Sequence, residues 1–212
     1  MKAKKKRKIH PVLLIALLAL LFYVGSLAVP ALERLTYPLR YEEIIGRISK
    51  DYDLDPYWAA AVIYCESGFH PEAKSRKGAL GLMQLMPETG AWIAEKLDMT
   101  GFTSDQLKEP EINIRCGCWY LAYLQKRFHG DRILMAAAYN AGPGKVDSWL
   151  QNEKYSAEGE LQFIPYEETR NYVEKIQRAY QKYQALYPDC WQNDAVSAAD
   201  PAAECLRGEA DA

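Results

Sequence analysis

The stretch DPYWAAAVIYCESG, residues 55–68, decides the fold class of this chain. Asp55 is a residue type favoured at a helix N-cap, Pro56 suits the first helical position, and Gly68 can end a helix. The residues between them are apolar on nearly every side, which is typical of a buried helix. A single carboxylate, Glu66, stands near its end. The sequence therefore predicts a buried central helix with one acid at its C-terminal end.

The segments on either side of this helix also carry helical signals. Apolar residues recur at helical spacing from Tyr41 onward, at Ile44, Ile45, Ile48 and Tyr52. Further helices are predicted over residues 88–97, 112–128, 132–140, 146–151 and 169–187. Strand signals are few, and the glycine-punctuated stretch 71–87 is predicted to be irregular, with a small β element near residues 79–86. We therefore expect a mainly α-helical domain over residues 41–187.

The N-terminal segment has the pattern of a membrane helix. A basic segment, residues 1–11, precedes a run without charge from Val12 to Val29, about the minimum length that spans a bilayer. Basic residues remain on the cytoplasmic side of such a helix. The run is longer than the roughly 7–15 residues of a signal-peptide core, which favours a retained transmembrane anchor over residues 12–29. Ser26-Leu27-Ala28 resembles a cleavage site, so a signal peptide stays open as the alternative.

Both alternatives place the domain outside the cytoplasm, joined by a linker over residues 30–40.

The first ten residues hold six of the 26 basic side chains and no acidic one. The rest of the chain carries 20 basic and 28 acidic side chains, a net charge of −8. Such an acidic domain argues against a nucleic-acid partner, which requires a basic surface.

The composition changes again after Pro188, and we expect a disordered tail over residues 188–212. Cys190 and Cys205 lie in this tail and could form a disulfide in an oxidising compartment. With Cys65, Cys116 and Cys118 they make an odd count, so not all five can pair within one chain. The sequence has no CxxC pair and its three histidines are scattered, so neither a metal site nor a cofactor is predicted.

Glu66 is the strongest candidate for chemistry. Burial and the negative end of the helix dipole both disfavour the charged carboxylate, which would keep the acid protonated near neutral pH. A proton donor to a glycosidic oxygen requires that state. The alternative is a helix-end glutamate that points to solvent.

Three other polar positions have both a functional and a structural interpretation. Gln84, in an apolar run, could hold an N-acetyl or hydroxyl group of a sugar, or could bond to backbone. Tyr139 and Asn140 could stand at the edge of a cleft, or simply precede the end of a helix. Glu168 would by itself be a solvated residue in the first turn of the last helix.

Four stretches taken together are more specific. They are Glu66-Ser67, GLMQLMP at 81–87, AYNAGPG at 138–144 and IPYEETRNYV at 164–173. In this order they resemble the soluble lytic transglycosylase family over about residues 41–187. The resemblance implies a goose-lysozyme-like α-helical fold with a sugar-binding cleft and Glu66 as the catalytic carboxylate. It also implies that the residues that line the cleft or support the acid are Ser75, Met83, Gln84, Tyr139, Asn140 and Glu168.

The reaction implied by the resemblance needs one carboxylate and no cofactor. Peptidoglycan glycan strands would be cleaved at the β-1,4 bond between N-acetylmuramic acid and N-acetylglucosamine, leaving a 1,6-anhydromuramic acid end. Glu66 would serve first as acid and then as base. Two alternatives remain: a hydrolytic muramidase of the same fold, and a non-catalytic wall-binding protein tethered to the membrane. The intact Glu66 argues against the second.

Overall fold

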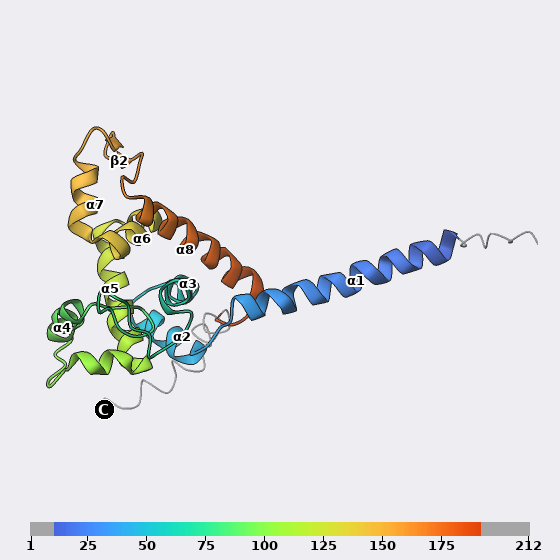
Figure 1. Ribbon diagram of the computed structural model, residues 1–212, viewed down its shortest axis with the longest axis horizontal. Helices are drawn as coiled ribbons and strands as arrows, with labels where there is room; N and C mark the ends of the chain where they lie inside the picture. The colour runs from blue at the N-terminus through green and yellow to red at the C-terminus, as the bar shows by residue number, and fades with distance from the viewer. Residues whose placement is uncertain (1–10, 192–212) are drawn as a thin grey trace, which may run out of the picture. The chain divides into compact units, whose positions relative to one another are not determined.

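The computed structural model describes residues 11–191, which divide into two compact units at Tyr37 (Figure 1). The first unit is one helix, α1 (Pro11–Thr36), whose described apolar side chains are largely exposed. Its segment Ile15–Thr36 is long and apolar enough to cross a membrane. A signal sequence can have the same length and apolarity. The helix continues beyond the predicted end at Val29, and part of the predicted linker is helical. Its last turns are rich in Ala, Leu, Glu and Arg, which favour helix strongly enough to continue past Pro30.

The second unit is mainly helical, as predicted, and its helices lie over the predicted segments with ends that differ by a few residues. In chain order it contains α2 (Glu42–Asp51), α3 (Pro56–Ser67), α4 (Pro87–Lys96), the 3₁₀ helix η1 (Ser104–Lys108), α5 (Pro110–Arg127), α6 (Arg132–Ala141), α7 (Pro143–Leu150), β1 (Ser156–Ala157), β2 (Glu160–Leu161) and α8 (Glu167–Leu186).

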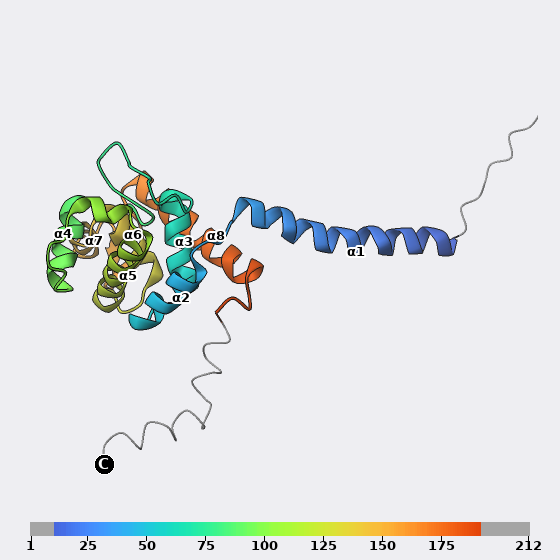
Figure 2. The same cartoon turned by 90° about the horizontal axis from the view of Figure 1, so that it is seen from below.

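Helix α3 packs against both α2 and α8 (Figure 2). Its local signals act as predicted. The Asp55 carboxylate accepts a hydrogen bond of 2.9 Å from the backbone N–H of Tyr57, and Gly68 ends the helix with a φ of 59°. All side chains from Trp58 to Ile63 are buried. This burial fixes the position of the helix end that carries Glu66.

The β element lies elsewhere than predicted. The two-stranded sheet is the antiparallel hairpin of β1 and β2, in which Ser156 pairs with Leu161. Its turn residues Glu158 and Gly159 both have positive φ, as a tight hairpin requires. The predicted stretch 79–86 contains only isolated bridges of Leu80. Positive φ values at Gly81 and Gln84 turn the chain there before strands can extend.

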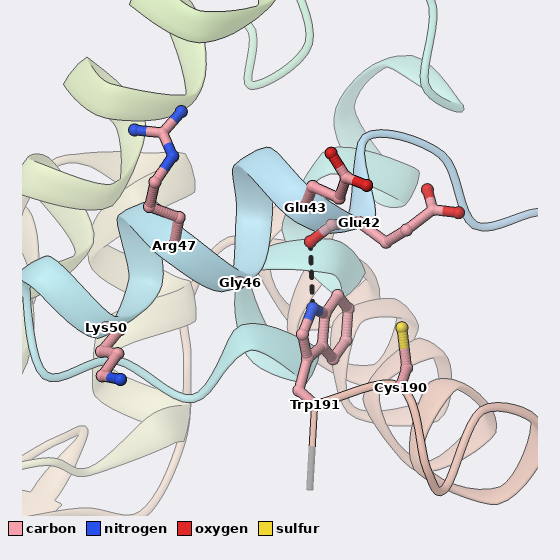
Figure 3. A pocket seen from close by; sticks show the side chains of 7 residues that line it. All are labelled: Glu42, Glu43, Gly46, Arg47, Lys50, Cys190 and Trp191. Atoms are coloured by element: carbon pink, nitrogen blue, oxygen red, sulfur yellow. Dashed lines mark hydrogen bonds between the residues drawn. The ribbon is translucent and has the colours of Figure 1, made fainter. Parts of the chain in front are cut away.

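The segment after α8 packs onto the domain up to Trp191. The indole N–H of Trp191 donates to the backbone oxygen of Glu42 at 3.0 Å (Figure 3). Its ring meets that of Tyr57 edge to face at 4.8 Å. A Cβ atom at Gly46 would lie 2.7 Å from the indole, so glycine permits the contact. Trp191 and Cys190 border a groove of about 420 Å³ on α2. Residues 188–191 thus differ from the expected disorder, while residues 192–212, including Cys205, lie outside the described part.

This packing predicts where the chain can be shortened. Truncation after Tyr187 removes the partly buried Trp191 and should lower the free energy of unfolding by about 1 kcal/mol, since fully burying one large apolar side chain contributes roughly 1.5–3 kcal/mol. Truncation after Trp191 is the matched control and should leave the thermal midpoint nearly unchanged. Thermal unfolding of both forms checks this. Equal midpoints for the two truncations would show that the Trp191 contact contributes nothing.

Candidate active site

Glu66 lies in the last turn of α3. Two residues of α8 form hydrogen bonds to this turn. The hydroxyl of Tyr172 donates a hydrogen bond to Oε1 of Glu66. One turn further along α8, the ammonium of Lys175 donates to the backbone oxygen of Cys65 at 2.8 Å. Both contacts join residues more than 100 positions apart in the chain. Neither Tyr172 nor Lys175 was singled out from the sequence, because nothing local indicates which residues of α8 face the end of α3.

The environment of Glu66 brings the pKa of its carboxyl close to neutral pH, where the protonated and the ionised forms are both populated. Burial raises the pKa of Glu66 to about 7, while the Tyr172 hydrogen bond and the charge of Lys175 oppose the rise. The side chain is partly buried rather than solvated. At neutral pH such a group is a proton donor and, once ionised, a proton acceptor. The geometry therefore favours the interpretation of Glu66 as a proton donor over that of a helix-end glutamate that points to solvent.

The partly buried Tyr139 and the buried Met83 form a support beside this carboxyl. The Tyr139 hydroxyl donates to the backbone oxygen of Met83 at 2.8 Å. Burial raises the pKa of Tyr139 well above its ordinary value, and the negative charge of Glu66 raises it further, which places the ring close to the acid. Met83 itself is fully buried, and a Cβ at Gly117 would overlap its sulfur. The side chain of Met83 thus fills the core, and its backbone oxygen accepts the hydrogen bond of Tyr139.

Ser75 and Gln84 hold the loop that precedes α4. The hydroxyl of Ser75 accepts a hydrogen bond of 3.0 Å from the backbone N–H of Ala79. The Gln84 amide donates to the backbone oxygens of Ala73 at 3.0 Å and Gly81 at 2.9 Å. Both amide protons of Gln84 are therefore used within the loop. These hydrogen bonds correspond to the structural interpretation of Gln84, in which its amide bonds to backbone.

Asn113 is a structural residue that the sequence analysis missed. It is fully buried in α5 and donates to the backbone oxygens of Leu80 at 3.0 Å and Leu107 at 2.6 Å. Its side-chain oxygen accepts from the backbone N–H of Met83 at 2.7 Å. The signal in the sequence was a lone amide between Ile112 and Ile114 in an apolar helical pattern, where a buried polar group needs partners. Asn113 thereby ties the loop that supports Glu66 to α5.

A groove brings together two of the predicted residues that are distant in sequence. Asn140, from the end of α6, and Glu168, from the first turn of α8, both line it, and its volume is about 500 Å³. The side-chain oxygen of Asn140 accepts a hydrogen bond of 2.8 Å from the hydroxyl of Thr169. Lys77 adds a positive charge to the same groove. Glu66 is not among the residues that line it.

The cysteines and the possible metal ligands of residues 11–191 form no second candidate centre. Cys116 and Cys118 are both fully buried, and burial raises the pKa of the Cys65 thiol to about 12, which makes it a poor nucleophile. Within residues 11–191, no three His, Cys, Asp or Glu side chains come together in a way that could hold a metal ion.

The Tyr172 contact predicts a shift in the pH dependence of any acid catalysis by Glu66. The tyrosine hydroxyl stabilises the charged carboxylate, so Tyr172→Phe should raise the pKa of Glu66 above about 7. A general acid works in its protonated form, and activity then falls as pH rises through that pKa. The alkaline limb of kcat/KM should therefore move to higher pH in the variant.

The control for this shift is Tyr180→Phe. Tyr180 lies on the same helix and donates to the Asp55 carboxylate at 2.6 Å, at the other end of α3. Its replacement should leave the alkaline limb where it is. An unmoved limb in Tyr172→Phe, or one displaced to lower pH, would contradict the assigned role of the Tyr172 hydroxyl.

Comparison with known proteins gives a consistent answer. Residues 43–162 match the family described as "Transglycosylase SLT domain". The chain is 39% identical over 150 residues to the soluble lytic murein transglycosylase of Escherichia coli K12, covering 69% of this chain and 23% of that protein. It is 30% identical over 166 residues to the membrane-bound lytic murein transglycosylase C of Glaesserella parasuis, covering 68% of this chain and 46% of that protein.

The solved structures agree. The 70-kDa soluble lytic transglycosylase of Escherichia coli superposes with a TM-score of 0.65 at 34% identity, over 72% of this chain and 25% of that one. Its complex with bulgecin A gives 0.67 at 34% identity, over 74% and 26% of the two chains. The region shared with this chain is thus about a quarter of the length of these soluble relatives.

Proposed function

Because the chain belongs to the transglycosylase SLT domain family, we propose that it is a peptidoglycan lytic transglycosylase. It would cleave the β-1,4 bond between N-acetylmuramic acid and N-acetylglucosamine and leave a 1,6-anhydromuramic acid end. The observation that carries the proposal is the single carboxyl of Glu66, held by Tyr172 at the end of a buried helix with its pKa raised to about 7.

The reaction uses this carboxyl twice. Protonated Glu66 gives its proton to the bridging oxygen as the bond from that oxygen to C1 of the muramic sugar breaks. The 2-acetamido carbonyl of the sugar stabilises the positive charge that develops at C1. The ionised carboxylate then takes the proton of the C6 hydroxyl as that oxygen bonds to C1. Glu66 ends protonated, the anhydro ring is closed, and no water is consumed.

The remaining predicted residues divide into two roles. Ser75, Met83, Gln84 and Tyr139 position the acid through the hydrogen bonds of the loop before α4. Asn140 and Glu168 are assigned to contact with the glycan, because they line the groove together with Lys77. Hydroxyl and acetamido groups of a sugar offer donors and acceptors to amide, carboxylate and ammonium groups.

The experiment that tests the proposal is mass analysis of the muropeptides released from purified peptidoglycan. A lytic transglycosylase gives products lighter by one water than those of a muramidase, reflecting the anhydro ring. Hydrated reducing ends as the primary product would replace the proposal by a hydrolytic muramidase. An absence of any cleavage by the folded protein would favour the non-catalytic wall-binding protein.

For the location, we propose that α1 is a retained single-pass anchor, with the basic segment in the cytoplasm and the SLT domain on the extracytoplasmic side of the cell membrane. The support is a segment of 22 residues with membrane-spanning length and apolarity that follows a basic flank. Protease added to cells lacking an outer barrier should then digest the domain. A mature N-terminus near Val29 would instead establish the cleaved signal peptide.

A further inference from the structure

A group of aromatic side chains between α4 and α5 takes no part in the mechanism above. Trp92 of α4 meets three rings of α5, with centroids 5.1 Å away for Trp119, 6.4 Å for Tyr120 and 5.5 Å for Tyr123. Tyr123 also stacks 6.0 Å from both Trp119 and Tyr120. We call these four residues the aromatic cluster. Helix α4 lies beside α5 in Figure 2, and the cluster joins them.

Core packing explains only part of the aromatic cluster. Trp119 and Tyr120 both pack against buried apolar side chains, and burial raises the pKa of Tyr120 to about 12. Trp92 is different, since 37% of its surface is exposed. Trp119 and Tyr123 are only partly buried. Trp92 and the exposed parts of Trp119 and Tyr123 therefore form an aromatic surface that solvent can reach, a feature more typical of a binding surface than of a core.

Polar groups stand at the edge of these rings. Arg127, at the end of α5, donates to the Tyr123 hydroxyl at 3.2 Å and to the Asp147 carboxylate of α7 at 2.5 Å. A pyranose ring has an apolar face of C–H groups and a rim of hydroxyls. Aromatic faces beside charged hydrogen-bonding groups match both parts of that surface. A few polar groups beside an apolar platform are the usual composition of such sites.

The aromatic cluster is connected ring by ring to the candidate active site. Tyr120 lies 5.5 Å from Tyr139, whose hydroxyl bonds to Met83 in the support beside Glu66. A glycan strand is a polymer, so its sugars continue beyond the bond that is cleaved. We propose that the aromatic cluster is a second binding surface for the glycan strand, on which sugars remote from the cleaved bond stack against Trp92 and Trp119. This inference rests on the proposed function.

The test compares long and short substrates in Trp92→Ala and Trp92→Phe. Ring stacking contributes about 0.5–1.5 kcal/mol, or roughly 2- to 10-fold in affinity. In Trp92→Ala the KM for long glycan strands should rise by about that factor, and more than the KM for a short glycan of four sugars. Trp92→Phe keeps a ring and should recover most of the loss. The control is Phe163→Ala, which removes a 50% exposed aromatic outside the cluster and should keep the wild-type ratio of KM values.

Direct binding separates this inference from the proposed function. The probe is a series of β-1,4-linked N-acetylglucosamine oligomers, titrated onto Glu66→Gln alone and onto Glu66→Gln with Trp92→Ala. The second protein should bind the longer oligomers several-fold more weakly. If Trp92→Ala lowers only the thermal midpoint and changes neither the KM ratio nor oligomer binding, the cluster is packing and the inference fails. If the wild type cleaves no glycan, the proposed function fails, and the titration still decides whether the cluster binds sugars.

Discussion

Glu66→Gln is expected to lower turnover of peptidoglycan by at least about 10²- to 10⁴-fold, the usual contribution of general acid–base catalysis. Glutamine keeps the size of the side chain and can still accept the Tyr172 hydrogen bond, but it has no proton to give to the glycosidic oxygen. Initial rates of muropeptide release, normalised to folded protein, measure the loss. Binding of glycan should persist, because the groove residues are unchanged.

The matched control is Glu43→Gln, which removes an exposed carboxylate on α2 that makes no contact with Glu66. It should retain the wild-type rate. Full activity in Glu66→Gln would remove the transglycosylase and the muramidase mechanisms together, since both require this acid. Loss of both activity and glycan binding would indicate that the substitution disturbs the cleft rather than the proton transfer.

Asn113→Ala is expected to have the largest effect on stability, roughly 3–5 kcal/mol. The substitution leaves the backbone oxygen of Leu107 and the backbone N–H of Met83 buried without a partner, while the Leu80 oxygen keeps the hydrogen bond that it accepts from Leu85 at 3.1 Å. Each unsatisfied buried group costs about 1–3 kcal/mol, and some relaxation reduces the sum. Denaturant unfolding of the domain measures the change.

Asn171→Ala is the control for Asn113, because Asn171 is exposed on α8 and its replacement should change stability little. The loop that Asn113 holds carries Met83, to which Tyr139 bonds. We therefore also expect catalysis by Asn113→Ala to fall at temperatures where the domain remains folded. A stability loss below 1 kcal/mol would mean that water or a shifted backbone replaces the three hydrogen bonds.

The sequence by itself determined the helical elements and singled out Glu66 as the candidate acid. Helix α3 shows why: its N-cap at Asp55, its proline at the first position and its glycine at the end act within a few residues of the chain. Hydrogen bonds and a 3.6-residue apolar period of this kind are local, so they can be recognised without knowing the fold. The four motifs similarly identified the family before any geometry was known.

Only the tertiary structure decided how the side chains near the acid are used. Tyr172 reaches Glu66 across 106 positions because α8 packs along α3, and no local pattern encodes the rotation of one helix against another. The hydrogen bonds of the Gln84 amide to the loop backbone depend on the path of the folded loop, which has positive φ values at Gly81 and at Gln84 itself. The position of Trp191 on α2 likewise depends on a distant glycine, Gly46. Contacts between distant residues depend on the packing of the whole domain, so they were decided by the tertiary structure.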